Sequence, residues 1–411
     1  MYKLGLKLWS DNQAYADEIK RLRIARSFDY IELYSMPDTF TKHIDFWIKI
    51  GGPFVIHAPH FGHGVNLSLR ETETRNRRLI DDARLFADKL NANCIIVHPG
   101  VNGHFHETIH QLLTFNDTRL VIENKPHLGF TDDQVCVGSR PADMESMLNA
   151  TGLNFCLDIG HAIYAANGLG INPIDHLAGF LKLRPTMYHF TDGDWNAVHD
   201  VHTRYGKGTF PLAGLLSLIP DDSMLTNEAG KSSKVSLSDF ESDSCYLKEL
   251  SGKTQSLVSI RSAKLDDARN LYELSMDPLV RASSLKSESF SFESHLEWFK
   301  LAIFDNSRRI YICEINNQFV GQIRFVLQDN IAVISISIIE FWRNTGVAPR
   351  LFRYAVDRLV TSAPAINQII ATVKCNNGPS NKFFQKLGFT AISGNPLVTS
   401  DSNIEYCLEL K

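Results

Sequence analysis

The chain has 411 residues, of which 44% are hydrophobic and 21% are charged, and its formal net charge is −4. This length exceeds one ordinary domain, and the composition is that of a globular protein with a large core, so we expect two domains. The weakly negative charge gives no general attraction to nucleic acid or to acidic membranes, which argues against both as partners. No apolar run approaches the roughly 20 residues of a membrane span.

The cysteines and the N-terminus bear on the compartment. The seven cysteines stand singly, without a C-x-x-C pair, so neither a disulfide framework nor a thiolate zinc site is indicated. The first residues have no apolar core of a secretory signal. We therefore expect a cytoplasmic protein with reduced thiols. The sequence leaves open whether the chain forms a homo-oligomer.

Over residues 1–232, short apolar runs alternate with helical patterns. The runs are almost continuously apolar, which is typical of parallel strands that are covered on both faces. They lie at 4–9, 30–34, 54–57, 94–98, 120–123, 155–158, 187–190 and 224–227. The clearest amphipathic segment is 70–90, with Leu79, Ala83 and Phe86 on one side. About eight strand-then-helix units predict a (β/α)8 barrel.

Ligand-type side chains stand where these predicted strands end. They are His57, His98, Glu123, Asp158, His161, His189, Asp200, His202 and Glu228. A barrel brings the carboxyl ends of its strands to one mouth, so these residues should converge. Any one of them could instead be a structural histidine or a helix cap. The whole set would place like charges close together unless a cation lies among them, so we expect a divalent metal site for Zn or Mn, with one to three ions.

The motifs HAP, VHPG, IEN, LDIGH, YHFTD, D-x-H and NEAG make this first half resemble the xylose-isomerase-like barrel superfamily. In the sugar isomerases and epimerases of that superfamily, four residues hold one metal. The resemblance places them at Glu123, Asp158, His189 and Glu228. It implies that the two glutamates serve as acid and base and move a proton between adjacent sugar carbons. A sugar phosphate or a nucleotide sugar is the expected substrate.

Endonuclease IV, in the same superfamily, offers an alternative. The resemblance places its additional metal ligands at His57, His98, His161, Asp200 and His202, with Glu123 as a bridge. Several metals favour phosphodiester hydrolysis, because they generate hydroxide and hold both the attacking and the leaving oxygen. Against a nuclease stand the acidic net charge and strand-end loops that look short, with few aromatic or arginine wedges.

A polar segment at 233–257, rich in Ser, Lys, Asp and Glu, predicts a linker with one short helix on the way. The second domain, 258–411, begins with a strand at 258–262 and helices at 265–276 and 292–304. Three strands at 309–315, 319–327 and 331–339, with turns at 316–317 and 329–330, predict an antiparallel meander. A helix at 349–360 and strands at 369–373 and 404–410 complete the expected α+β fold.

The joint after the third of these strands predicts an anion site. Arg343, Gly346 and Ala348 stand where a helix begins, so free backbone N–H groups and the helix dipole point at one place. On its own this pattern is also explained by a simple strand–turn–helix joint. With the element order and the segment 377–389, however, residues 258–411 resemble the GNAT acetyltransferase family, with a mixed and largely antiparallel sheet.

That resemblance implies acetyl-CoA as cofactor. It places Arg343, Gly346 and Ala348 at the pyrophosphate and makes Asn377 a CoA contact. It also implies that the backbone of Ile338 and Ile339 pairs with the pantetheine arm.

Two residues bear on the chemistry of acetyl transfer. Glu340 is a candidate base, although an ordinary exposed glutamate at a strand end is an equal interpretation. Phe384 stands where the family commonly has a tyrosine that protonates the departing thiolate, and phenylalanine has no proton to give. The second domain could therefore be a weakened enzyme or a binding module.

The segment DPLVRASSLKSESFSFESHLEWF and the strands YICE, VGQIRF and ISISI resemble acetyltransferases of nonulosonic (pseudaminic-type) acid biosynthesis. This implies a nucleotide-linked amino sugar as acceptor, near Arg281, His295, Trp298 and Arg324. Taken together, the sequence predicts a bifunctional enzyme of surface-glycan synthesis, in which a metal-dependent sugar isomerase or epimerase precedes an N-acetyltransferase.

Overall fold

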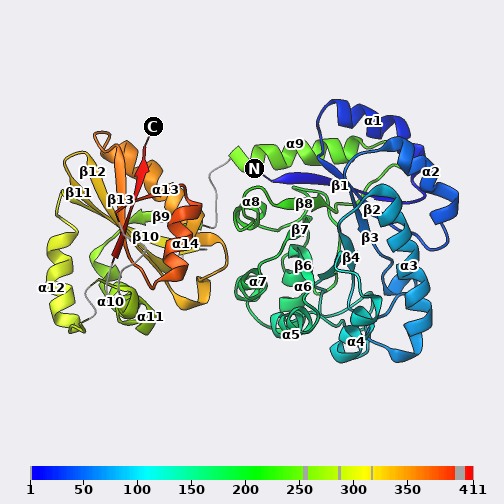
Figure 1. The fold of residues 1–411 in the computed structure, drawn as a ribbon, viewed down its shortest axis with the longest axis horizontal. Coiled ribbons are helices and arrows are strands. Elements are labelled where there is room, and N and C mark those ends of the chain that lie inside the picture. The colour runs from blue at the N-terminus through cyan, green and yellow to red at the C-terminus, as the bar shows by residue number, and fades with distance from the viewer. Residues whose placement is uncertain (1, 253–257, 286–287, 316–317, 394–402, 411) are drawn as a thin grey trace. The chain divides into compact units, whose positions relative to one another are not determined.

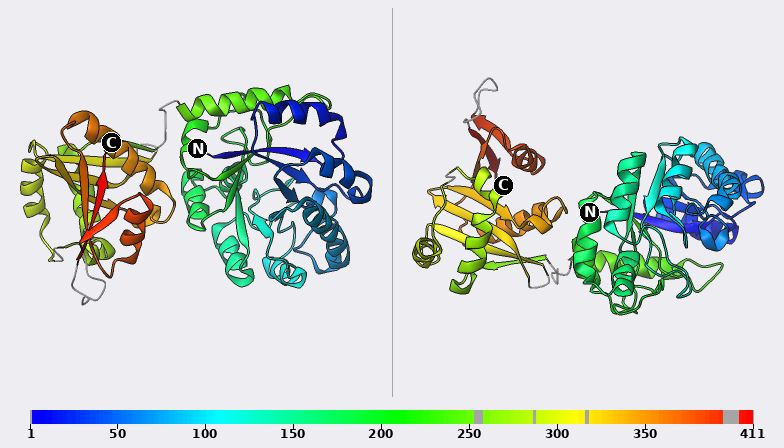
Figure 2. Two further views of the ribbon diagram at one scale, coloured as in Figure 1. Left: turned by 45° about the horizontal axis from the view of Figure 1, so that its top comes forward. Right: turned by 90° about the horizontal axis from the view of Figure 1, so that it is seen from below.

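The computed structural model describes residues 2–252, 258–285, 288–315, 318–393 and 403–410. The chain divides into two compact units, residues 1–255 and 256–411 (Figures 1 and 2). The predicted turn at 316–317 lies outside the described residues.

Eight parallel strands form a closed barrel in the first unit, in chain order (Figure 1). They are β1 Lys3–Trp9, β2 Tyr30–Tyr34, β3 Phe54–His57, β4 Ile95–Val97, β5 Leu120–Glu123, β6 Asn154–Asp158, β7 Met187–Phe190 and β8 Met224–Asn227. β1 pairs with β8 in parallel, with Leu6 opposite Asn227, and this pairing closes the barrel. The predicted barrel is confirmed, and each strand lies within one residue of its expected bounds.

Helices follow the strands and lie outside them (Figure 2). They are α1 Ala16–Ile24, α2 Phe40–Ile50, α3 Glu73–Leu90, α4 Phe105–Phe115, α5 Pro141–Thr151, α6 Ile159–Leu169, α7 Pro173–Lys182 and α8 Leu212–Ser217. In α3 the apolar side buries Leu79, Ala83 and Phe86, as its spacing predicts. Among the described residues, no helix combines the length and the apolar character needed to cross a lipid bilayer.

Most of the segment predicted as a linker belongs to the barrel unit. Helix α9, Ser238–Gly252, covers much of 233–257, and Leu237, Phe240 and Leu247 are completely or almost completely buried. Arg21 on α1 pairs with Glu241 at 3.0 Å. The polar composition misled the prediction, because a few apolar residues at helical spacing are enough to bury one face. Residues 253–257 lie outside the described part of the chain.

The second unit is a seven-stranded sheet in the order β14-β15-β13-β12-β11-β10-β9. The strands are β9 Val258–Ser262, β10 Arg308–Ile315, β11 Gln318–Gln328, β12 Ile331–Ile338, β13 Gln368–Lys374, β14 Thr390–Ser393 and β15 Asn403–Glu409. Among the described strands of this sheet, β12 and β13 form the one parallel pair, so the predicted mixed and largely antiparallel sheet is confirmed. Strand β14 was not predicted.

In the described part of this unit, five α-helices accompany the sheet. They are α10 Ala268–Met276, α11 Pro278–Ser283, α12 Phe292–Ala302, α13 Val347–Ser362 and α14 Gly378–Lys386. Leu271 and Phe299, from α10 and α12, pack in one buried cluster with Ile310 and Ile312 of β10. The short helix α11 was not predicted.

The parallel pairing between β12 and β13 covers a short part of both strands. Within the described residues, β12 pairs with β13 from Ile331 to Val333, although both strands continue further. The two strands therefore separate toward the end of β12. The backbone that follows Val333 on that side is not used by β13.

Candidate functional site

The nine ligand-type residues form one network at the mouth of the barrel: six lie at strand ends, His161 lies in the first turn of α6, and Asp200 and His202 lie in the loop after β7. His57, Glu123 and Asp158 are the last residues of β3, β5 and β6, and His98 and Glu228 directly follow β4 and β8. Eight of the nine are at most one-fifth exposed, whereas the side chain of His202 is 44% exposed. Thus His202 lies at the rim, and the others lie inside the mouth.

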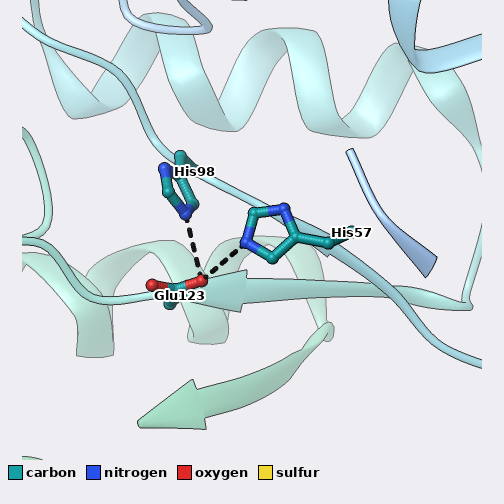
Figure 3. A group of neighbouring side chains, drawn as sticks. All are labelled: His57, His98 and Glu123. Carbon is teal, nitrogen blue, oxygen red and sulfur yellow. Dashed lines mark hydrogen bonds and ion pairs between the residues drawn. The ribbon is translucent and has the colours of Figure 1, made fainter. Parts of the chain in front are cut away.

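Glu123 is the centre of the network (Figure 3). Its Oε2 lies 3.2 Å from Nε2 of His57 and 3.0 Å from Nε2 of His98. Its Oε1 lies 3.1 Å from Nδ1 of His161. Two imidazoles from strand ends and one from the start of α6 therefore meet at one carboxylate.

The remaining members continue the network from Glu123. Nδ1 of His189 lies 2.9 Å from Glu228 and 3.5 Å from Glu123. Asp200 lies 3.2 Å from Nε2 of His161 and 3.1 Å from Nε2 of His202. Asp158 also caps helix α6 by accepting a hydrogen bond from the backbone N–H of His161. The capping interpretation of Asp158 and its place in the cluster are therefore both correct.

Burial and charge shift the titration of these groups strongly. Burial lowers the pKa of His57 and of His98, so both imidazoles are neutral. Burial raises the pKa of Asp158 to about 6. Burial alone would lower the pKa of His161, but Asp158 and Asp200 raise it to about 10. The mouth thus buries several ionisable carboxylates and imidazoles close together, where burial disfavours their charged forms.

The donor set fits a divalent cation. Nδ1 of His57 faces the carbonyl oxygen of Ala58 at 2.8 Å, and its Nε2 faces Glu123. A neutral imidazole has one N–H, so one of these nitrogens presents a lone pair to an oxygen that also has only lone pairs. A cation between Nε2 and the carboxylate removes this mismatch. The trios His57–His98–Glu123 and Glu123–Asp158–His161 each offer ligand atoms within 4.8 Å of one another.

The sequence analysis missed two residues of the mouth, the partly buried Lys7 and the buried Glu32. Nζ of Lys7 lies 3.1 Å from Glu32 and also bonds Glu228, and Glu32 is completely buried. Both lie inside strands rather than at strand ends. The alternation of side chains along a strand could have identified them, because side chains two residues apart on a strand point to the same face.

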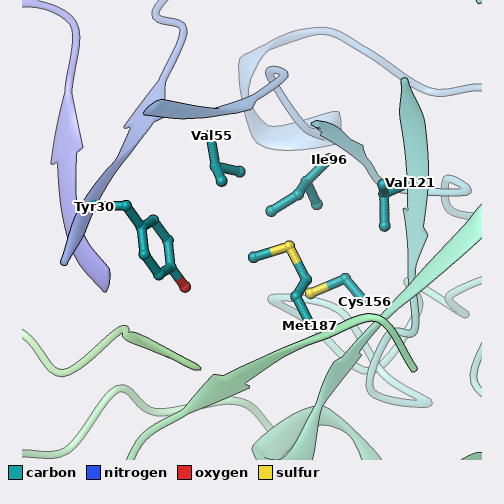
Figure 4. Close-up of a cluster of buried hydrophobic side chains, with 6 residues drawn as sticks. All are labelled: Tyr30, Val55, Ile96, Val121, Cys156 and Met187. Carbon is teal, nitrogen blue, oxygen red and sulfur yellow. The ribbon is translucent and has the colours of Figure 1, made fainter. Parts of the chain in front are cut away.

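That signal comes from the apolar layer inside the barrel. This layer consists of Tyr30, Val55, Ile96, Val121, Cys156 and Met187 (Figure 4). Two residues further along each strand stand the members of the mouth: Glu32, His57, His98, Glu123, Asp158 and His189. Counting from the apolar layer would have found Glu32, which counting from strand ends did not.

Lys125 was also missed. It is 7% exposed, and its Nζ lies 3.3 Å from Nε2 of His161. It follows Glu123 by two residues, beyond the end of β5. The mouth therefore contains two lysines in addition to the predicted ligands.

An aromatic cluster lines one side of the mouth, contrary to the expectation of few aromatic residues in these loops. Its members are Trp9, Tyr34, His60, Phe61, His63 and Phe130. His60 stacks on His98, with ring centroids 5.5 Å apart, so the cluster is continuous with the network. Trp9 is 48% exposed and Phe130 is 67% exposed. Trp9 and Tyr34 are the last residues of β1 and β2, His60, Phe61 and His63 follow β3, and Phe130 follows β5, so only the fold brings the cluster together.

In the second unit the predicted anion site has the expected backbone. Gly346 has a φ of 83° and Asn344 a φ of 64°, and helix α13 begins at Val347, with Ala348 in its first turn. Free N–H groups at a helix start after left-handed residues form an anion-binding concavity. The guanidinium of Arg343 is engaged inside the domain, because its Nε bonds the carbonyl of Ile338 and its Nη2 lies 3.0 Å from Asp277.

The other predicted CoA contacts have structural partners of their own. The backbone N–H of Ile339 bonds the carbonyl of Val320, and the side chain of Asn377 caps helix α14. Phe384 is 4% exposed and packs against Phe389 and Tyr406. Their roles toward CoA stay predictions.

Glu340 lines a cavity of about 230 Å³, together with Glu273 and Asp277. A carboxylate in that position can take a proton from an ammonium group. The position of Glu340 therefore fits a general base and also fits an ordinary exposed glutamate at a strand end.

A larger cavity of about 470 Å³ gathers all four predicted acceptor residues, Arg281, His295, Trp298 and Arg324. Among the residues that the structure describes, no carboxylate pairs with Arg281 or Arg324, and the Nε of each has no hydrogen-bond partner. Arg324 stacks over Trp298 at 5.6 Å, and burial lowers its pKa. A desolvated guanidinium without a counter-charge favours an anionic ligand.

Comparison with known proteins assigns the second unit. Residues 268–389 match the model of the acetyltransferase (GNAT) family. No curated protein matches the chain. The C-terminal domain is therefore a GNAT acetyltransferase domain, and it follows a closed eight-stranded (β/α)8 barrel.

Solved structures similar to the chain fall into two groups. A D-tagatose 3-epimerase-like protein is 18% identical, covers 61% of this chain and 97% of its own, and gives a TM-score of 0.45. Spermidine N-acetyltransferase from Vibrio cholerae is 16% identical and covers 37% and 95%, with a TM-score of 0.34. An acetyltransferase from Salmonella typhimurium that modifies ribosomal protein L7/L12 is 14% identical and covers 38% and 95%, with a TM-score of 0.33.

Proposed function

We propose that the chain is a bifunctional enzyme of amino-sugar metabolism in surface-glycan synthesis. The barrel is a metal-dependent isomerase or epimerase of a sugar phosphate or nucleotide sugar. The GNAT domain transfers an acetyl group from acetyl-CoA to the amine of a nucleotide-linked amino sugar of the nonulosonic type. The observation that carries the barrel proposal is that two buried carboxylates, Glu123 and Glu228, face the same ring nitrogen of His189.

In the barrel, Glu123, Asp158, His189 and Glu228 would hold a divalent ion such as Zn or Mn. When bound, the ion supplies Lewis-acid polarisation of substrate oxygens. Glu123 and Glu228 lie 3.5 Å and 2.9 Å from the same nitrogen of His189, so two carboxylates flank one point. One can remove a proton from a carbon while the other returns a proton to the neighbouring carbon. Burial of the pair excludes bulk water from this exchange.

Solvent exchange tests this chemistry. The metal-supplemented protein is incubated in D₂O with a panel of sugar phosphates and nucleotide sugars, and mass spectrometry measures deuterium at carbon. We expect incorporation with the wild type, and at least 100-fold slower incorporation with Glu123→Gln or Glu228→Gln. Exposed Glu145→Gln is the matched control. Exchange that persists in both site variants would refute the acid–base assignment.

A phosphodiesterase of the endonuclease IV kind is the second candidate. The observation that favours it is that all nine residues form one network, whereas a one-metal isomerase needs four of them. The exposed aromatic cluster beside His98 adds a surface on which a base could stack. Incision of a duplex with one abasic site, together with binding that falls steeply as salt rises, would support this candidate. Absence of incision at high protein concentration removes it.

The acetyl-transfer proposal rests on the GNAT fold and on the cavity with Arg281 and Arg324. Two guanidinium groups without carboxylate partners suit the phosphates of a nucleotide sugar and disfavour a cationic polyamine. Release of free CoA from acetyl-CoA, measured with nucleotide-linked amino sugars, neutral amino sugars and spermidine, compares these acceptors. Equal or faster turnover of spermidine would contradict the proposed acceptor.

The alternative for the GNAT domain is a binding module without catalysis, because the buried Phe384 offers no proton to the departing thiolate. Calorimetric binding of acetyl-CoA without turnover of any acceptor would indicate a binding module. A cytoplasmic location is part of the proposal, supported by seven free cysteines.

A further inference from the structure

His189 is held at both ring nitrogens by carboxylates. Its Nε2 lies 2.9 Å from Oε2 of Glu32, and its Nδ1 lies 2.9 Å from Oε1 of Glu228. The side chains of His189 and Glu32 are both 0% exposed. Which nitrogen carries the ring proton therefore decides which nitrogen is free to act as a ligand.

Glu32 is itself fixed from the side opposite the mouth. Thr226 donates its hydroxyl to Oε2 of Glu32 at 2.6 Å, and Tyr30 shares a hydrogen bond of 2.8 Å with the Thr226 hydroxyl. The second oxygen of Glu32 lies 3.1 Å from Nζ of Lys7. A chain of buried contacts thus runs from Tyr30 through Thr226 and Glu32 to His189.

Lys7 gives the buried carboxylate of Glu32 a charged partner. A buried carboxylate is costly unless it is paired and hydrogen-bonded, and Glu32 has both an ammonium and a hydroxyl partner. An ionised carboxylate only accepts hydrogen bonds. Nε2 of His189 makes a hydrogen bond with Glu32, whereas Nδ1 has no hydrogen-bond partner among the described residues, so the geometry places the ring proton on Nε2.

We infer that Glu32 is a positioning residue for the metal site: it keeps the proton of His189 on Nε2 and directs Nδ1 toward Glu123 and Glu228, while the ion pair with Lys7 holds Glu32 in place. This inference rests on the proposed metal function of the barrel. It assigns roles to two residues that none of the strand-end motifs contains. Hydrogen-bonded carboxylates behind a histidine ligand commonly raise its basicity and fix its orientation.

The alternative, that Glu32 only stabilises the barrel, makes a different prediction. A purely structural carboxylate would leave the tautomer of His189 and the metal affinity unchanged once folding is accounted for. Since replacing a buried ion pair by apolar groups is often neutral or stabilising, stability alone does not require Glu32 and Lys7 in this place. Direct observation of the ring nitrogens separates the two roles.

The experiment uses the full chain with ¹⁵N-labelled histidine, first metal-free and then with Zn²⁺. His189→Asn identifies the signals of His189. In the wild type we expect Nε2 of His189 to carry a proton in both states and Nδ1 to change on addition of Zn²⁺. In Glu32→Gln the preference for the proton on Nε2 should weaken. A proton on Nδ1 with a bare Nε2 in the metal-free wild type would overturn the inference.

Zn²⁺ affinity provides the second readout. Loss of a hydrogen-bond partner behind a ligand typically costs 10- to 100-fold in affinity, and we expect about this loss for Glu32→Gln. Glu32→Asp keeps the charge and should recover part of it, and exposed Glu145→Gln should lose none. Thr226→Val keeps Glu32 itself and guards against a Glu32 variant that fails to fold, with an expected loss of a few-fold.

The outcomes are distinguishable from failure of the proposed function. If the wild type does not bind Zn²⁺, the metal proposal fails, and the metal-free spectrum still tests whether Glu32 sets the tautomer. If Zn²⁺ binds equally to wild type and folded Glu32→Gln, the metal proposal stands and the positioning role of Glu32 is refuted.

Discussion

The barrel mouth and the acceptor cavity of the GNAT domain both bury charged side chains, but carboxylates predominate in the mouth and arginines lack carboxylate partners in the cavity. The mouth packs five carboxylates, Glu32, Glu123, Asp158, Asp200 and Glu228, against imidazoles and two lysines. The acceptor cavity leaves Arg281 and Arg324 without carboxylate partners among the described residues. The mouth therefore favours a cation, and the cavity favours an anion.

The two sites also differ in what builds them. In the mouth, side chains at the ends of separate parallel strands meet because the barrel is closed. In the GNAT domain, the predicted anion site before α13 consists of backbone, with left-handed residues at Asn344 and Gly346 on either side of Thr345. Side-chain replacements should thus abolish function in the barrel, whereas backbone changes should matter more in the GNAT domain.

The largest expected effect concerns the boundary of the barrel. A chain that ends at residue 232 lacks Leu237, Phe240 and Leu247, which are buried against the barrel. Each buried large apolar side chain contributes roughly 1.5–3 kcal/mol, so we expect a loss comparable with the whole stability of a domain. Urea unfolding measures this loss. A chain ending at residue 252 is the control and should unfold cooperatively; equal stability of the two chains would show that α9 is a linker after all.

The next effect tests the centre of the mouth. Glu123→Gln removes the charge at which His57, His98 and His161 meet. Loss of a residue behind a metal ligand typically costs 10- to 100-fold in affinity, so loss of a charged ligand itself should lower metal affinity by more than about 100-fold. Elemental analysis and calorimetry measure this fall. Retention of full affinity would mean that Glu123 is not the bridging ligand.

A smaller effect tests the anionic character of the acceptor cavity. Arg324→Gln should raise KM for a nucleotide-linked acceptor by about 10- to 100-fold, because a charge-assisted hydrogen bond contributes roughly 1.5–3 kcal/mol. The KM for acetyl-CoA should stay unchanged. Arg309→Gln is the matched control, since Arg309 neighbours Arg308 of the cavity but points to the other face of β10. An equal effect of both variants would argue against specific recognition.

The smallest effect tests the backbone site. Gly346 has a φ of 83°, and a side chain there costs roughly 1–2 kcal/mol. Gly346→Ala should therefore weaken acetyl-CoA binding by about 5- to 30-fold, as measured by calorimetry, and leave metal binding to the barrel unchanged. Val347→Ala, at the next position but with an ordinary helical backbone, should change acetyl-CoA affinity much less.

These comparisons also explain how far the sequence could predict the molecule. The apolar runs predicted all eight barrel strands, because parallel strands buried on both faces leave an unmistakable pattern. The strand ends predicted the nine residues of the mouth, since topology alone makes them converge. Glu32 and Lys7 were missed because they lie inside strands, where the alternation of inward side chains has to be counted from the core layer.

Other features depend on tertiary contacts that no local pattern carries. Helix α9 was read as a linker, although three apolar residues in a polar segment suffice to dock it on the barrel. The aromatic cluster is assembled from Trp9, Tyr34, Phe130 and the loop after β3, which are far apart in sequence. The ion pair of Arg343 with Asp277 depends on α11, a short helix that the sequence did not predict.

The central claim is that the barrel mouth holds a divalent cation, and metal content of the purified full-length chain tests it most directly. Elemental analysis before and after dialysis against Zn²⁺ or Mn²⁺ gives ions per chain, with Glu228→Gln measured in parallel. We predict at least one tightly held ion that is lost in the variant; one ion favours the isomerase or epimerase, and two or three favour phosphate-ester hydrolysis. A chain that binds no metal after reconstitution would contradict the account of the barrel and leave acetyl transfer as the remaining activity.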